Sequence, residues 1–162
     1  MSTQVSRRSL ELQAWVSLLR THAAVTRQLD RELVQEHGLT INDYEVLLHL
    51  SRAEGRMLRR VDLASRVLLT PSGITRLLDG LERNGLVTKA SCRTDARVVY
   101  AKLTDKGAKR LEDAAGSHIA SIRALFGERF SEEELESLAS LLERLPQAPG
   151  AGDSCAPPDA TT

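Results

Sequence analysis

Hydrophobic residues recur every three or four positions along most of the chain, a pattern that predicts a mainly helical protein. The first such stretch covers residues 9–36, where apolar side chains alternate with Arg and Glu, and it stops at His37 and Gly38. Thr40 is a suitable N-cap for a second helix that Gly55 ends. The pattern therefore predicts one long and one shorter amphipathic helix in the first third of the chain.

The middle of the chain changes from a helical to a strand periodicity. A short helix is predicted at 58–68, and Thr70 with Pro71 predicts the start of another at 71–84, because Thr caps helices and Pro suits their first turn. Residues 86–103 then read as two short strands around a polar, basic turn. Two short helices followed by such a hairpin predict a winged helix-turn-helix.

Two further helices and a polar tail follow the hairpin. Thr104 is a suitable N-cap for a helix that runs to about Phe126, and Ser131 with Glu134 has the spacing of a capping box before a last, leucine-rich helix. The 17 residues from Pro146 contain four Pro, two Gly and four Ala but no large hydrophobic residue. We expect this tail to be disordered, because it cannot bury enough apolar surface to offset the entropy of ordering.

The net charge of the chain is zero, but the charges are unevenly distributed. Residues 52–110 carry 14 Lys and Arg against six Asp and Glu, whereas the remaining residues carry eight basic and 16 acidic groups. A local positive excess is typical of a surface that binds phosphate. Because this block coincides with the predicted winged domain, it favours nucleic acid as the partner; a solvated patch without function is the alternative.

Other classes of protein receive no support from the sequence. No run of 18 apolar residues and no apolar signal core at the N-terminus is present, so we expect a cytoplasmic protein. Cys92 and Cys155 are too few for a disulfide framework, and the four His lack metal-ligand spacing. No phosphate loop, nucleophile elbow or paired-carboxylate motif is present. We therefore expect no catalytic activity, cofactor, metal or membrane span.

The predicted helix at 71–84 presents short polar and basic side chains on its hydrophilic face. The second helix of a helix-turn-helix enters the major groove, where each base pair shows a distinct pattern of donors and acceptors. Ser72 and Thr75 can meet phosphate or base, and Arg76 can donate two parallel hydrogen bonds to a guanine edge. The alternative is that these are ordinary solvent-facing positions.

The tip of the predicted wing holds an acidic and a basic residue two positions apart. Asp95 can hold the guanidinium of Arg97 in one orientation, which lowers the entropy lost when the Arg enters a narrow, negative minor groove. The predicted DNA-binding residues are Arg59, Thr70, Ser72, Gly73, Thr75, Arg76, Arg93, Asp95 and Arg97.

The wing also carries the most specific motif of the sequence. The stretch DARVVYAKLTDKG, residues 95–107, resembles the wing signature of the MarR (multiple antibiotic resistance regulator) family of bacterial repressors. Upstream, TRLLD at 75–79 and NGLV at 84–87 are similar to the recognition-helix pattern of that family, and the resemblance covers about residues 9–145. The chain departs from the pattern at Ala96, where a second Arg is common, and at Gly80, where a basic or polar residue is usual.

The resemblance implies a homodimer that presents two winged domains to a pseudo-palindromic operator in double-stranded DNA. The leucine-rich faces of the terminal helices agree with it, because a small monomer would have trouble burying them; packing within one chain is the alternative. The implied organisation has an N-terminal dimerisation helix at 1–37, a winged helix-turn-helix at 38–104 with its recognition helix at 71–84 and its wing at 86–103, C-terminal dimerisation helices at 105–145, and a tail at 146–162.

Regulators of this family often bind a small aromatic acid or phenol between the dimerisation helices and the winged domain. Trp15 and His22 lie seven residues apart, so they share one helix face, and Tyr44 comes from the next helix. Together with Arg20 or Arg7 as a counter-charge they suit a planar anion; the alternative for His22 is a core or interface position. Cys92 is expected to be a bystander at the wing.

Together with this resemblance, the sequence predicts a cytoplasmic, nucleoid-associated bacterial transcriptional regulator that binds a specific DNA sequence. The resemblance further implies a repressor that an aromatic or phenolic ligand releases. One alternative is an architectural protein, which would bind random DNA as well as any particular sequence. Another is an adaptor whose winged domain has lost DNA binding, which would retain no duplex at physiological salt.

Overall fold

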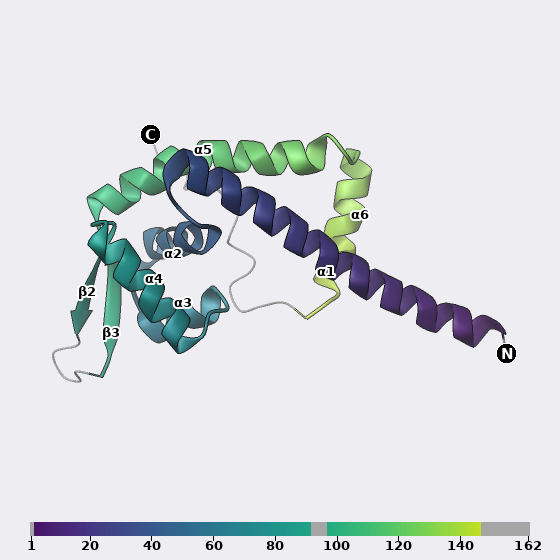
Figure 1. Cartoon of the computed structure of the whole chain (residues 1–162), viewed down its shortest axis with the longest axis horizontal. Helices are drawn as coiled ribbons and strands as arrows, with labels where there is room; N and C mark the ends of the chain where they lie inside the picture. Colours follow the sequence, from purple (N-terminus) through teal and green to yellow (C-terminus); the bar gives the residue numbers. More distant parts are fainter. Residues whose placement is uncertain (1, 92–96, 147–162) are drawn as a thin grey trace.

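Within residues 2–91 and 97–146, which the structure describes, the computed structural model contains six α-helices, one short 3-10 helix and three strands (Figure 1). In chain order the elements are α1 (Ser2–His37), α2 (Ile41–Arg52), η1 (Glu54–Arg56), β1 (Met57–Arg59), α3 (Arg60–Arg66), α4 (Pro71–Arg83), β2 (Val87–Ser91), β3 (Val99–Leu103), α5 (Asp105–Gly127) and α6 (Glu132–Glu143). The expected class, mainly α with a small β wing and flanking terminal helices, is confirmed.

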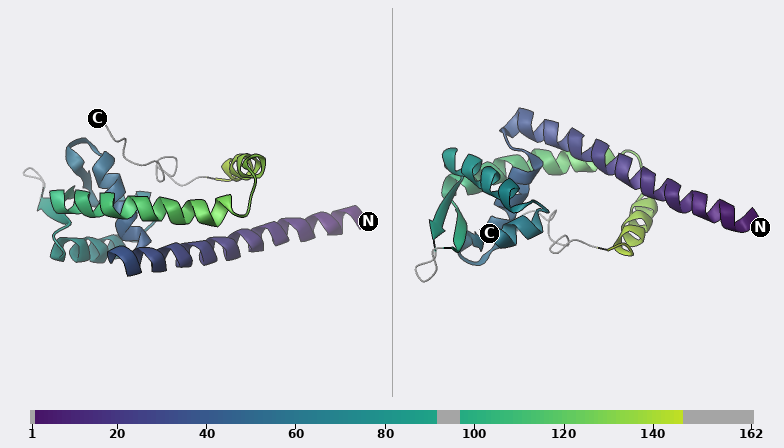
Figure 2. Two further views of the ribbon diagram at one scale, coloured as in Figure 1. Left: turned by 90° about the horizontal axis from the view of Figure 1, so that it is seen from above. Right: turned by 60° about the horizontal axis from the view of Figure 1, so that its bottom comes forward.

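The long terminal helices lie to one side of the winged domain. The C-terminal part of α1 packs beside α5, while its N-terminal part projects away from the rest of the chain (Figures 1 and 2). Helix α6 follows at the end of α5 that is remote from the sheet (Figure 2). The recognition helix and the wing therefore stand at the opposite end of the molecule from the free end of α1.

The N-caps predicted at Thr40 and Ser131 are confirmed, whereas α1 begins at Ser2 and not near residue 9. The Thr40 hydroxyl accepts a hydrogen bond from the Asp43 amide at 3.1 Å, and the Asp43 carboxylate accepts one from the Thr40 amide at 2.9 Å. Ser131 and Glu134 form the same reciprocal box at the start of α6. Helix α1 ends at His37, and the next residue, Gly38, has a φ of 66°, in the left-handed region that Gly adopts without strain.

The sheet corrects one prediction. Residues 57–59 form strand β1, and the helix expected at 58–68 begins only at Arg60. The strand order is β1-β3-β2, and both neighbours of β3 run antiparallel to it, with Leu58 opposite Ala101 and Val87 opposite Leu103. Residues 57–59 become a strand because the second edge of β3 offers them backbone partners, which is a contact between distant segments.

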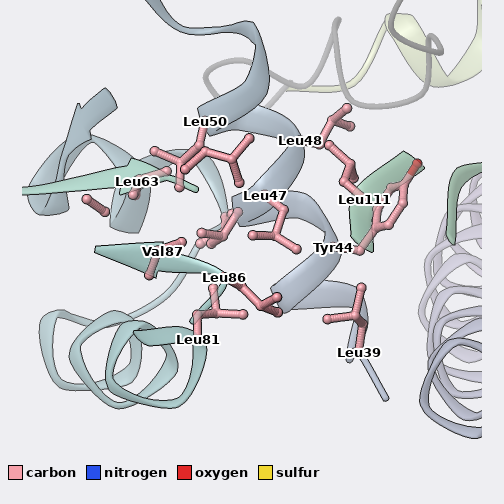
Figure 3. Close-up of a cluster of buried hydrophobic side chains, with 14 of the residues drawn as sticks. Leu39, Tyr44, Leu47, Leu48, Leu50, Leu63, Leu81, Leu86, Val87 and Leu111 are labelled. Carbon is pink, nitrogen blue, oxygen red and sulfur yellow. The ribbon is translucent and has the colours of Figure 1, made fainter. Parts of the chain in front are cut away.

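The hydrophobic core is built around α2 (Figure 3). Val46, Leu47 and Leu50 of α2 have no exposed surface, and Tyr44 and Leu48 of the same helix are also buried. Side chains from the neighbouring elements close around them: Leu63, Leu78, Leu81, Leu86, Val87, Leu103 and Leu111. The core thus belongs to the winged domain and to the beginning of α5, and Leu33 from the C-terminal part of α1 also joins it.

Helix α6 and the N-terminal part of α1 expose apolar side chains, whereas Leu29 and Leu33 near the C-terminal end of α1 are buried. Leu12 of α1 is 65% exposed, and Leu141 of α6 is 57% exposed. Among the side chains that the structure describes, the large exposed apolar residues on these two helices and just after α6 are Leu10, Leu12, Trp15, Val16, Leu19, Val34, Leu141, Leu142 and Leu145. None of the helices in the described ranges is both long and apolar enough to cross a membrane.

Helix α5 begins so close to the chain before β2 that only Gly fits at one position. A β-carbon on Gly107 would overlap the carbonyl oxygen of Leu86 and press on the Leu103 side chain. We expect Gly107→Ala to lower the free energy of unfolding by about 2–3 kcal/mol, because the backbone of Leu86 must move. Urea denaturation measures this change.

Gly116 in the same helix is the matched control for this substitution. A β-carbon there would meet nothing within 4 Å. Gly116→Ala should raise the free energy of unfolding by about 0.5–1 kcal/mol, the usual difference between Ala and Gly in a helix interior. Equal effects of the two substitutions would contradict the close approach at Gly107.

Candidate nucleic-acid interface

Helix α4 holds the predicted recognition residues at a well-defined N-terminus. The Thr70 hydroxyl caps the helix by accepting a hydrogen bond from the Gly73 amide at 3.1 Å, and Pro71 occupies the first turn. Ile74, Leu78 and Leu81 anchor the helix in the core, which leaves the side chains of Ser72 and Arg76 exposed. Two of the predicted DNA-binding side chains therefore face solvent together at one end of α4.

Helix α4 itself is stabilised by the contacts of Thr70, Gly73 and Thr75. A β-carbon at Gly73 would lie 3.1 Å from the Thr70 hydroxyl oxygen, so Gly leaves room for the cap. The Thr75 hydroxyl donates a hydrogen bond to the Pro71 carbonyl at 2.8 Å, and its side chain is half-buried. Thr75 therefore offers only acceptor lone pairs to an outside partner, a narrower role than the sequence suggests.

Arg59 lies where β1 meets α3 and is already paired. Its Nε donates to Asp62 Oδ2 at 2.8 Å and its Nη2 donates to Asp62 Oδ1 at 3.2 Å. The same carboxylate raises the pKa of Arg59 above its ordinary value. A phosphate contact by Arg59 would have to share its guanidinium with Asp62.

The wing is described up to its tip. Cys92, Arg93 and Asp95 lie outside the described residues. Arg97 has an exposed side chain and lies two residues before β3, at the start of the returning strand of the hairpin. The expected pairing of Asp95 with Arg97 stays a prediction.

Sequence reasoning missed an ionic network between the wing and the recognition helix. Lys89 of β2 lies 2.6 Å from Asp79 Oδ1 and 2.9 Å from Glu82 Oε2, measured from its Nζ. Hydrogen bonds from Lys89 lower the pKa of both carboxyl groups, and those two acids raise the pKa of Lys89. The spacing of seven and ten residues gives no local signal for such a contact.

Within one chain, the four predicted ligand-binding residues do not lie together. Trp15, Arg20 and His22 are exposed on α1, whereas Tyr44 is 5% exposed and packs against His118 of α5 with ring centroids 4.7 Å apart. Among the described side chains of α1, Leu29 is the first that is buried, about 21 Å along the helix from Trp15. The ligand pocket therefore stays a prediction that needs a second chain.

An open groove of about 380 Å³ between α1 and α5 contains none of those four residues. Its lining is mostly polar and acidic: Gln28, Glu32, Glu36, Ser121, Ala124, Leu125, Glu128 and Arg129. This groove does not suit an aromatic anion, because its three carboxylates would repel the ligand.

Comparison with known proteins identifies the family to which this fold belongs. Residues 37–98 match the MarR family. The chain is 36% identical over 121 residues to the HTH-type transcriptional repressor YetL of Bacillus subtilis, an overlap that covers 69% of this chain and 72% of YetL. The chain belongs to the MarR family. Members of this family are DNA-binding transcriptional regulators, not enzymes.

Two solved MarR family structures agree with the assignment. AbsC from Streptomyces coelicolor is 34% identical and superposes with a TM-score of 0.73, covering 82% of this chain and 89% of AbsC. Sco3205 from the same organism, solved in complex with DNA, is 29% identical with a TM-score of 0.76, covering 83% of this chain and 84% of Sco3205. The winged helix-turn-helix is thus shown both by its geometry and by its relatives.

The burial of His118 beside Tyr44 leads to a prediction about how the stability of the protein depends on pH. Burial lowers the pKa of His118 below its ordinary value, and its Nδ1 atom has no hydrogen-bond partner in the described part of the chain. The unfolded chain therefore takes up a proton at a higher pH than the native protein, so the free energy of unfolding should decrease as the pH falls through about 6.5. In urea denaturation at about pH 7.5 and 5.5, His118→Gln should reduce this acid-induced loss.

Glu45 provides a control, because its effect on the pH dependence of stability has the opposite sign to that of His118. Burial raises the pKa of its carboxyl group, so the native protein takes up this proton first and gains stability on acidification. Glu45→Gln should therefore remove this gain and lower the stability at acid pH relative to neutral pH, a change opposite in sign to that of His118→Gln. An unchanged pH dependence in the His118 variant would contradict the buried, neutral state of that imidazole.

Proposed function

We propose that this MarR family protein is a homodimeric repressor that binds a pseudo-palindromic operator in the bacterial cytoplasm. Helix α4 enters the major groove with Ser72 and Arg76, and the wing reaches the adjacent minor groove with Arg97. The observation that carries the proposal is the exposed N-terminal face of α4 beside the basic hairpin. The relative YetL, named a repressor, and the DNA-bound neighbour Sco3205 support it.

The exposed apolar residues of α1 and α6 support the dimer. They lie on the two helices that contribute least to the core, and α6 buries none of its described side chains. A soluble monomer rarely exposes a contiguous apolar surface of this kind, whereas a partner chain would cover it. A symmetric dimer also presents two recognition helices, which a pseudo-palindrome requires.

Sedimentation tests the dimer. The full chain should sediment with about twice its mass of 17.8 kDa at micromolar concentration. Leu12→Glu combined with Leu19→Glu should shift it toward the monomer, because two carboxylates would be buried in the interface. Val61→Glu is the control, since Val61 is equally exposed but lies on α3. A monomeric wild-type protein would contradict the proposal.

Arg76 tests the reading of DNA sequence. The probe is a duplex enriched by the full chain from randomised DNA, hereafter the selected duplex. Arg76→Ala should weaken binding to it by about 1–3 kcal/mol and relax the preference at one position in each half-site. Arg27→Ala, which removes an exposed Arg from α1, should leave binding near wild type. Equal binding of wild-type protein to selected and random duplexes would instead support the architectural alternative.

We further propose that a small aromatic acid or phenol releases the DNA. The proposal rests on Trp15, Arg20, His22 and Tyr44 and on family membership, with one wall of the pocket supplied by the partner chain. Such a ligand acts only through its different affinity for two dimer shapes, and about 1–3 kcal/mol of coupling would weaken DNA binding about 5- to 150-fold.

Trp15 reports on the ligand, because it is the one Trp of the sequence. Salicylate should change its fluorescence and weaken binding to the selected duplex, and His22→Ala should weaken both responses without affecting DNA binding of the free protein. If a broad panel of aromatic acids and phenols changes neither signal, the pocket is wrong and Trp15 belongs to the dimer interface alone.

A further inference from the structure

Lys89 connects the outgoing strand of the wing to the recognition helix at three points. Its Nζ lies 2.6 Å from Asp79 Oδ1 and 2.9 Å from Glu82 Oε2. Its backbone amide also donates a hydrogen bond to Glu82 Oε1 at 3.1 Å. Asp79 and Glu82 are three residues apart on α4, so they share the helix face that lies toward β2.

We propose that Lys89 is a positioning residue that holds the wing at a fixed place relative to α4, and that it is not a phosphate contact. This inference rests on the proposed DNA-binding function and names a residue through which that function acts. It distinguishes Lys89 from the other Lys and Arg residues of the basic stretch 52–110. From charge alone, all of these residues would be interpreted as DNA contacts.

The edge position of β2 explains why the strand needs this contact. In the order β1-β3-β2, strand β2 pairs on one side only, which leaves backbone groups on its other edge without a strand partner. The Glu82 carboxylate takes up one of them, the amide of Lys89. The base of the hairpin is also fixed by buried Leu86 and Val87, whereas Lys89 acts two residues closer to the tip.

The charge balance of the cluster argues against a phosphate contact. Lys89 is 29% exposed and faces two carboxylates, so the cluster as a whole carries one negative charge. To reach a phosphate, the ammonium group would have to leave both acids. Lys102 on β3 lies in the same sheet but differs from Lys89, because its side chain is exposed.

The first test compares salt dependence on the selected duplex. Lys89→Gln should weaken binding about five-fold through lost positioning while the slope of log K against log salt stays at the wild-type value. Loss of a phosphate contact would instead reduce the slope by about 0.9 and weaken random duplexes equally. Lys89→Arg should restore the affinity, and Lys102→Gln measures the effect of removing one charge from the same sheet.

The second test replaces Asp79 and Glu82. Electrostatic attraction alone and loss of positioning predict opposite changes in the affinity for the selected duplex. The double substitution Asp79→Asn and Glu82→Gln adds positive charge, so electrostatic attraction alone predicts tighter binding to every duplex. Loss of positioning predicts weaker binding to the selected duplex, by about five-fold, and tighter binding to a random one. Tighter binding to both would overturn the proposal.

A measurement without DNA separates this inference from the proposed function. In the free full-length protein, Lys89→Gln should speed amide hydrogen exchange in β2 about three-fold or more and leave α1 and α5 unchanged, and Lys89→Arg should restore the wild-type rate. Unchanged exchange in β2 would overturn the positioning role. If the wild-type protein prefers no duplex, the proposed function fails while the exchange result still decides the role of Lys89.

Discussion

The burial of helix α2 is the constraint on which the rest of the molecule depends. Elements α1, α4, α5, β1 and β3 all pack against it, and its central side chains are closed to solvent. Because a close-packed core transmits small displacements, α2 fixes the recognition helix, the root of the wing and the start of α5 relative to one another. The core thereby also positions the predicted DNA-binding residues of α4, Ser72 and Arg76, which are exposed and do not belong to it.

Polar contacts join α1 and α5 to this core beside the α1–α2 turn. The Asp30 carboxylate accepts a hydrogen bond from the Ile41 amide at 2.9 Å, and Arg110 Nη1 donates one to the His37 carbonyl at 2.6 Å. His37 Nε2 is also within hydrogen-bond distance, 2.7 Å, of the Ser117 hydroxyl. These contacts tie the C-terminal end of α1 to both α2 and α5.

The features that the sequence predicted correctly are those that local physics decides. Caps at Thr40, Thr70, Thr104 and Ser131, and the apolar periodicity of α4, depend on residues within one or two turns of each other. The same applies to the exposure of Ser72 and Arg76, which follows from the helix period alone.

The features that escaped prediction depend on contacts between distant segments. Strand β1 exists because β3 has a second edge, and the Lys89 network forms because the hairpin folds back over α4. The shared face of Trp15 and His22 was predictable from their spacing, but the direction of that face was not. Tyr44 shows the same limit, because its partner His118 comes from α5.

Sequencing the duplexes that the full chain enriches from randomised DNA tests the central claim most directly. A symmetric dimer with one α4 per chain predicts a pseudo-palindromic consensus whose half-sites are centred about 10 base pairs apart, because each α4 must meet the same groove face one turn on. Enrichment of a single, unpaired half-site would contradict the dimer. No enrichment above random DNA would contradict sequence-specific regulation itself.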